Sequence, residues 1–285
     1  MTADPKILES TLVEGVLTLT LNRPDRRNAL HPPLMRALVD ALADAQDDAR
    51  VRCVLLRGAG KDFCVGGDVA AAKDANDARE PSPEEQAAAA EKAAKRGPIT
   101  PEQLTAWLRR SADSARLLHQ MPKVTVAALH GNVVGAGLGL ALACDFRIVA
   151  DSTKFTAGFL KVGYSGDFGG AWFLQNLVGA AKARELYLLN ETIDAGTAER
   201  LGLSTRRVAD DQLDAAATEF AAKIAKGPPI AMRYMKANFL SARTTPLDQY
   251  LDLETRNQNR TGMTQDSKEA LKALFEKRAP IFKGE

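Results

Sequence analysis

The sequence lacks several features that would assign it to a common functional class. Its three cysteines, Cys53, Cys64 and Cys144, are odd in number and far apart, so neither a disulfide framework nor zinc-ligand spacing is present. Isolated thiols of this kind suit a reducing compartment. The three histidines share no ligand spacing either, and we expect no metal site.

An excess of charge of one sign is also missing. Across 285 residues, 38 Lys and Arg stand against 36 Asp and Glu, which gives no global field for nucleic acid or a membrane surface. The longest apolar run, Val133 to Cys144, is rich in glycine and shorter than the roughly 20 residues that cross a bilayer. The start of the chain carries Asp4, Lys6 and Glu9 and no apolar core, unlike a secretory signal. We therefore expect a cytoplasmic protein with no nucleic-acid or membrane partner.

Complete nucleotide-binding and hydrolase motifs are absent as well. A dinucleotide fingerprint would need glycine where Leu140 stands, and a P-loop would need Gly-Lys followed by Ser or Thr. The segment Gly163 to Asp167 differs from the Gly-x-Ser-x-Gly motif of serine hydrolases at its last position, where aspartate replaces glycine. The sequence thus disfavours these three classes of site.

Apolar periodicity predicts strands alternating with helices first, and mainly helices later. Strands are expected at Val16–Leu21, Val51–Leu56, Val124–Leu129 and Phe146–Ala150. One helical face precedes the second strand and another precedes the third, namely Leu34, Leu38, Leu42 and Ala45, then Leu104, Leu108, Ala112 and Ala115. Later helices are expected at Gly170–Val178, Ala180–Leu189, Ala195–Leu201, Leu213–Lys226, Ile230–Ala242, Leu247–Thr261 and Gln265–Lys277. This order predicts an α/β fold, with a core over residues 1–209 and a helical region over 210–285.

Residues 70–101 differ in composition from the rest of the chain. They are rich in Ala, Glu and Lys, are interrupted by proline, and show little apolar periodicity. One interpretation is a lid-like insertion, and the other is a solvated surface helix from Pro83 to Lys95. The residues leave both open.

Two glycine-rich turns are the clearest sign of a binding site. Phe63 to Asp68 follows the second predicted strand, and Gly131 to Gly139 follows the third. Glycine lets backbone N–H groups approach a ligand closely, and a helix start adds unpaired donors and partial positive charge. Two such turns side by side would hold one carbonyl oxygen, although each alone is also what a tight turn requires.

Ordered segments along the chain resemble the landmarks of the enoyl-CoA hydratase/isomerase (crotonase) superfamily, from about Leu12 to Lys283. They are Leu21-Asn22-Arg23-Pro24 with Asn28-Ala29-Leu30, Phe63 to Asp68, Gly131 with Gly135-Ala136-Gly137, Cys144-Asp145, and Ala279-Pro280 with Phe282. The resemblance implies a crotonase-like spiral of ββα units whose C-terminal helices trimerise, as a homotrimer or a dimer of trimers. It implies an acyl-CoA thioester as substrate, with coenzyme A part of that substrate and no tightly bound cofactor.

The resemblance also assigns roles to individual residues. The N–H groups of Gly67 and Ala136 fall where the family holds the thioester oxyanion, and they form the catalytic set together with Asp167. Substrate contacts are implied for Arg26, Ala29, Gly67, Asp68, Val69, Ala70, Ala136, Phe159, Phe282 and Lys283. The last two would come from the tail of a neighbouring subunit.

The chain departs from the hydratase pattern at its two glutamates, which fall on Gly139 and Phe159. Neither residue can carry a proton. Asp167 remains, at a position where several isomerases of the family have an acidic residue, although it would also suit the N-cap of a helix starting near Gly169. We expect double-bond isomerisation of a bulky enoyl-CoA, with Asp167 as the single acid/base. The alternatives are hydration by a non-standard base, hydrolysis within the same fold, and a non-catalytic acyl-CoA binder.

Overall fold

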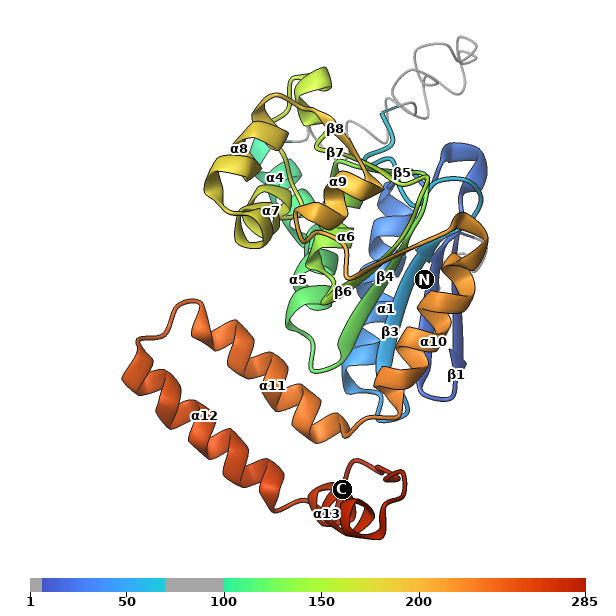
Figure 1. Ribbon diagram of the computed structural model, residues 1–285. Helices are drawn as coiled ribbons and strands as arrows, with labels where there is room; N and C mark the ends of the chain where they lie inside the picture. Colours follow the sequence, from blue (N-terminus) through green and yellow to red (C-terminus); the bar gives the residue numbers. More distant parts are fainter. Residues whose placement is uncertain (1–6, 70–99) are drawn as a thin grey trace, which may run out of the picture.

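A six-stranded sheet forms the centre of the computed structural model, which describes residues 7–69 and 100–285 (Figure 1). The strand order is β1-β2-β3-β4-β6-β9, antiparallel between β1 and β2 and parallel from β2 onward. The strands are β1 (Leu8–Val13), β2 (Val16–Leu21), β3 (Cys53–Gly58), β4 (Val124–Leu129), β6 (Phe146–Ala150) and β9 (Arg206–Val208). Because β2, β3 and β4 are parallel, the loops that follow them meet at one edge of the sheet.

A smaller sheet has the order β5-β7-β8. It consists of β5 (Asn132–Val134), β7 (Lys154–Thr156) and β8 (Thr192–Asp194). Since β5 begins soon after β4 ends, the smaller sheet starts at the edge where the loops of the large sheet meet. Two isolated bridges, Leu30 with Gly67 and Cys64 with Val133, tie these loops together.

The large sheet is buried on both faces. On β3, Val54 and Leu56 belong to the main core, which includes residues of α1 (Pro32–Asp47), α5 (Asp113–Gln120) and α6 (Ala136–Ala143). The alternate residues Cys53 and Leu55 face the opposite way, into a second core with α10 (Leu213–Ala225). A parallel strand covered on both faces reads as a continuous apolar run, which is how the sequence presents this one.

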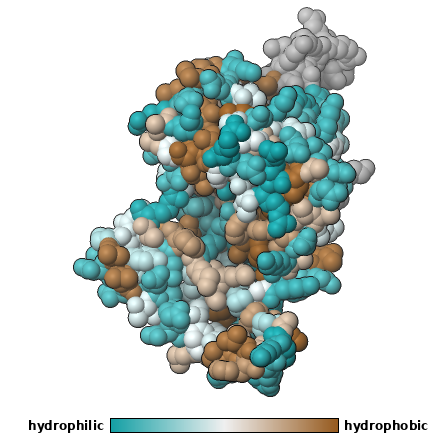
Figure 2. Space-filling view, in the orientation of Figure 1, coloured by the Kyte–Doolittle hydropathy of each residue, from teal (hydrophilic) through white to brown (hydrophobic). Residues whose placement is uncertain are grey.

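The remaining helices lie around and beyond this centre. They are α4 (Pro101–Ser111), α7 (Gly170–Val178), α8 (Ala180–Leu188), α9 (Ala195–Arg200), α11 (Pro229–Ala242), α12 (Leu247–Gly262), α13 (Gln265–Glu276) and the short η1 (Pro24–Arg26), η2 (Phe159–Val162) and η3 (Asp210–Gln212). Helices α11 and α12 form an antiparallel pair that projects from the sheet, and α13 ends the chain (Figure 1). Apolar side chains gather over α13 at the bottom of Figure 2. No described helix is long and apolar enough to cross a membrane.

Several sequence-based expectations need correction. The sequence predicts mainly helix after Ala150, but β7, β8 and β9 lie there, and β1 and β5 are also unforeseen. The single helical face predicted from Leu104 to Ala115 is wrong, because the helix breaks at Ala112 and Leu104 and Leu108 are exposed. Residues 70–99, interpreted as a lid or a surface helix, lie outside the described residues. The boundary at residue 210 stays a prediction, although α10 just beyond it packs on the sheet.

Candidate active site

The two glycine turns are held side by side by backbone hydrogen bonds. Leu30 N–H donates to the Gly66 carbonyl at 2.7 Å and so joins the loop after β2 to the turn after β3. Cys64 N–H donates to Asn132 at 3.2 Å, and Val134 N–H donates back to Cys64 at 2.9 Å. The turn after β3 is therefore attached to its neighbours on both sides.

The amides of Gly67 and Ala136 lie close to each other. A Cβ built on Gly66 would lie 3.5 Å from the Ala136 nitrogen. Covalent geometry puts the Gly67 nitrogen about 3 Å from the same point, which limits the separation of the two nitrogens to about 6.5 Å. Within residues 7–69 and 100–285, neither N–H donates a hydrogen bond. Ala136 is the first residue of α6, so its free donor also lies at the positive end of the helix dipole. That both amides point at one oxygen stays a prediction.

Asp167 lies in a tight turn before α7. Its neighbours Gly166, Phe168 and Gly169 all have positive φ, at 111°, 48° and 71°. The N-cap of α7 is Gly169 and no side chain caps the helix, so the interpretation of Asp167 as an N-cap is wrong. Among the described residues its buried Oδ1 has no hydrogen-bond partner. Burial raises the pKa of Asp167 to about 6, as expected when nothing compensates a desolvated carboxylate.

The turn that carries Asp167 occupies the space where a side chain at position 139 would begin. A Cβ on Gly139 would lie 2.8 Å from both the Cβ and the carbonyl oxygen of Phe168. Position 139 is also about one helical turn beyond Ala136 in α6. The turn that carries Asp167 therefore packs through Phe168 on α6, the helix that begins at Ala136.

An aromatic pair closes the space between the second glycine turn and the Asp167 turn. The ring of Phe159 stacks on Tyr187, with centroids 5.9 Å apart and planes at 29°. Phe159 Cζ would lie 3.7 Å from a Cβ on Gly135, and the Tyr187 hydroxyl packs directly on Gly166. Burial, and then the charge of Asp167, raises the pKa of Tyr187 to about 12. Tyr187 therefore lies close enough to the Asp167 carboxyl group for that charge to act on its phenol.

Other residues assigned to substrate binding lie on the first glycine turn and its neighbouring loop. Ala29 is buried, and its carbonyl accepts a hydrogen bond from Arg23. The Asp68 carboxylate pairs with the same Arg23 at 2.9 Å, so its side chain is already engaged. Val69 is exposed, and Ala70 lies outside the described residues.

Three further assigned residues lie away from the amides of their own chain or on the surface. Arg26 is exposed at the end of η1. The Phe282 carbonyl accepts from Arg52 at 2.9 Å, next to the amino end of β3, whereas the glycine turn follows its carboxyl end. Lys283 N–H donates to Asp266 at 2.7 Å. A single chain does not bring this tail to the site, and an approach from a neighbouring subunit stays a prediction.

Sequence reasoning missed the polar residues that support the turns. Asn28 is fully buried and has a positive φ of 56°. Its amide group donates to the carbonyls of Ala59 and Asp62 at 2.8 and 2.7 Å, and its Oδ1 accepts from Arg23 N–H at 2.9 Å. A buried amide side chain needs hydrogen-bond partners, but Asn28 stands seven residues after β2, and only the fold shows that it is buried.

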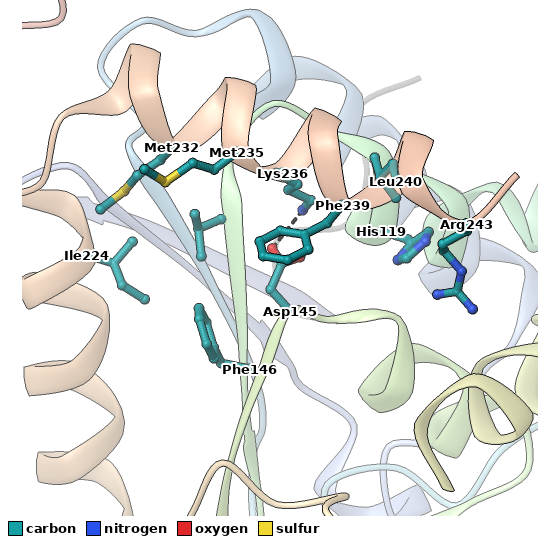
Figure 3. A pocket seen from close by; sticks show the side chains of 11 residues that line it. His119, Asp145, Phe146, Ile224, Met232, Met235, Lys236, Phe239, Leu240 and Arg243 are labelled. Carbon is teal, nitrogen blue, oxygen red and sulfur yellow. Dashed lines mark hydrogen bonds and ion pairs between the residues drawn. The ribbon is translucent and has the colours of Figure 1, made fainter. Parts of the chain in front are cut away.

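An apolar cavity of about 440 Å³ lies elsewhere, between α11, the end of α10 and β6 (Figure 3). Met232, Met235 and Phe239 of α11 line it, and the ion pair of Lys236 with Asp145 lies beside them. None of the residues assigned to the thioester site lines this cavity. In the described ranges, no group of His, Cys, Asp and Glu side chains could hold a metal ion.

Comparisons with known proteins agree on one family. The family described as "Enoyl-CoA hydratase/isomerase" matches residues 11–100 and 93–285. The 1,2-epoxyphenylacetyl-CoA isomerase of Escherichia coli (strain K12) is 34% identical, over 96% of this chain and 97% of its own. The crystal structure of a putative enoyl-CoA hydratase from Streptomyces coelicolor A3(2) superposes with a TM-score of 0.87 at 33% identity, over 100% and 97% of the two chains. A putative enoyl-CoA hydratase from Thermobifida fusca YX, solved in complex with CoA, has a TM-score of 0.77 at 30% identity, over 92% and 96%.

Proposed function

This chain belongs to the enoyl-CoA hydratase/isomerase family, and from that premise we propose that it shifts a double bond in an enoyl-CoA thioester with Asp167 as the only acid/base. The predicted family and its crotonase-like α/β fold are confirmed. The observation that carries the proposal is the half-buried carboxyl of Asp167, whose buried Oδ1 has no partner among the described residues and whose neighbour Phe168 packs on Gly139 of α6, the helix that begins at Ala136.

The reaction needs one proton carrier and one oxyanion site. The Asp167 carboxylate takes a proton from a carbon next to, or conjugated with, the thioester carbonyl. The electron pair of that C–H bond moves into the carbonyl, and the N–H groups of Gly67 and Ala136 stabilise the resulting enolate oxygen. Asp167 then returns the proton to a different carbon, so the double bond moves and the atoms balance. A carboxyl with a pKa near 6 is mostly ionised at pH 7 and is basic enough for this task.

Isomerisation is favoured over hydration because hydration also requires activated water. The hydratase glutamates correspond to Gly139 and Phe159, and the packing of Phe168 on Gly139 leaves no space for a side chain there. A single carboxylate can take and return one proton, whereas water addition needs a base for the water and an acid for the carbon. The relatives' names include both an isomerase and hydratases, so the choice depends on the residues of the site.

We also propose a flat or bulky apolar acyl group, supported by the Phe159–Tyr187 stack beside the two turns. A panel of enoyl-CoA thioesters incubated in deuterated water tests the proposal. The expected result is deuterium uptake and double-bond migration with no gain of water. Products heavier by one water molecule would mean hydration, and binding without any exchange in the whole panel would favour a non-catalytic acyl-CoA binder.

The assembly expected for the family forms part of this proposal. Large apolar side chains remain exposed on the last three helices and at the end of α12, among them Phe239, Met263, Leu274 and Phe275, each more than two-thirds exposed. Their burial in a homotrimer, alone or paired as a dimer of trimers, would remove this apolar surface from water. Light scattering tests the expectation, and a monomer at micromolar concentration would contradict it.

With three buried free thiols and a CoA substrate, we propose a cytoplasmic location.

A further inference from the structure

Asp62 is a buried carboxylate that contacts all three loops of the site. Its residue is 3% exposed. Oδ1 accepts from the backbone and side-chain N–H groups of Asn132 at 2.9 and 2.6 Å, and Oδ2 accepts from Arg27 Nε at 2.7 Å. Arg27 follows β2, Asp62 follows β3, and Asn132 follows β4. One side chain therefore joins three loops that are far apart in the sequence.

The place of Asp62 in the sequence connects it to both oxyanion amides. Asp62 stands five residues before Gly67, and Asn132 stands four residues before Ala136. The two segments also run alongside each other, because Cys64 N–H donates to the Asn132 carbonyl. A change in the contact between Asp62 and Asn132 would therefore alter the distance between the two amides.

The partners of Asp62 keep it charged. Burial alone would raise its pKa, but the hydrogen bonds from Arg27 and Asn132 and the charge of Arg27 outweigh burial and hold the pKa of Asp62 below its usual value. Hydrogen bonds to an ionised acceptor are roughly twice as strong as neutral ones. The contact between the loops is consequently stronger than a backbone bridge alone would make it.

We propose that Asp62 is a positioning residue for the thioester site, which sets the spacing of the Gly67 and Ala136 amides by holding the loop of one turn against the loop of the other. It acts through Asn132 and Arg27. The inference rests on the proposed function, because it assumes that these two amides hold a thioester carbonyl.

The chain contains a matched control at the other end of β4. The Asp145 carboxylate accepts from Thr125 N–H at 2.8 Å, from the Thr125 hydroxyl at 3.1 Å and from Lys236 Nζ at 2.7 Å, and its pair with Lys236 is visible in Figure 3. Like Asp62, it binds the backbone and the side chain of one residue together with a cation. Thr125 lies near the start of β4, away from the glycine turns.

The experiment compares Asp62→Asn with Asp145→Asn in the full chain. The probe is crotonyl-CoA labelled with ¹³C at the thioester carbonyl, whose stretching frequency falls when an oxyanion site polarises it. We expect Asp62→Asn to lose most of the downshift seen in the parent and about 100-fold in deuterium exchange, the scale of an approximately 1 Å misplacement. Its affinity for CoA alone, which has no thioester carbonyl, should stay unchanged. Asp145→Asn should keep the downshift and the exchange rate, even if its melting temperature falls as much as that of Asp62→Asn.

A second variant keeps the test decisive if Asp62→Asn does not fold. Asn132→Ala retains the Asp62 carboxylate and the backbone donor and should lose part of the downshift. The role of Asp62 is overturned if both variants polarise the carbonyl as the parent does, or if Asp145→Asn loses the downshift equally. A parent that neither lowers the carbonyl frequency nor exchanges deuterium would instead overturn the proposed function, and this role with it.

Discussion

Asp62 and Asp167 are carboxylates on loops that we assign to the proposed thioester site, yet their surroundings shift their pKa values in opposite directions. Asp62 has hydrogen-bond partners for both oxygens, and its pKa lies below the usual value. Asp167 leaves a buried oxygen without a partner in the described chain, and burial raises its pKa to about 6. Each carboxyl group has a buried oxygen, Oδ1 in both residues, so the partners make the difference. A carboxylate held by donors supports structure, whereas one without donors can exchange a proton near neutral pH.

Removing the unpartnered carboxylate should have the largest effect. We expect Asp167→Asn to slow deuterium exchange by about a hundred- to ten-thousand-fold, the usual contribution of a general acid/base. Acyl-CoA affinity should stay within a few-fold of the parent, because the amides of Gly67 and Ala136 are untouched. Exchange kinetics and calorimetry measure the two quantities. Exchange at the parental rate would rule out Asp167 as the proton carrier.

A smaller loss should follow when the turn is moved while its carboxylate is kept. Gly139→Ala places a Cβ against Phe168, where 2.8 Å is available. Such overpacking lowers the free energy of unfolding by about 1–3 kcal/mol, and the backbone of the turn shifts to make room. We expect a lower melting temperature and a reduced rate, with CoA affinity retained. Ala141→Gly in the same helix is the control for helix perturbation. An active, fully stable Gly139→Ala would show that the turn and position 139 are independent.

The smallest effect concerns the free energy of unfolding. Its dependence on pH should have opposite signs for the two carboxylates. The folded pKa of Asp167 is raised, so its protonated form favours folding, and this contribution is lost as the pH rises from about 4 through 6. The folded pKa of Asp62 is lowered, so its contribution is present above the unfolded value near 3.9 and is lost on acidification. At pH 7, Asp62→Asn should therefore lower the free energy of unfolding, whereas Asp167→Asn should not. Denaturant titrations at pH 5 and 7 measure both, and a loss at Asp167 equal to that at Asp62 would contradict the comparison.

Local patterns predicted the long elements well. The bounds of β2, β4, β6 and α7 agree with the sequence analysis because each has a strong apolar period or run. Strands β5, β7 and β8 have three residues each and are defined by pairing with distant segments, so no local pattern reveals them.

The sequence could predict single residues of the site but not the contacts between them. Asp167 was identified by its place in the resemblance, but its missing partner and the packing of its neighbour Phe168 on α6 required the structure. Asp62 was overlooked because its partners Arg27 and Asn132 lie 35 and 70 residues away. The fold creates such contacts, and the order of residues in the chain does not show them.

The most direct test of Asp167 as the proton carrier is a titration of its own carboxyl group. Carbon-13 NMR of the aspartate side chains, assigned by the loss of one signal in Asp167→Asn, gives its pKa in the free enzyme, and the pH dependence of deuterium exchange under kcat/KM conditions gives the pKa of the essential base. The account predicts that both values coincide near 6. An Asp167 signal that titrates near 4, or an exchange rate that does not change as Asp167 ionises, would contradict its role as the proton carrier.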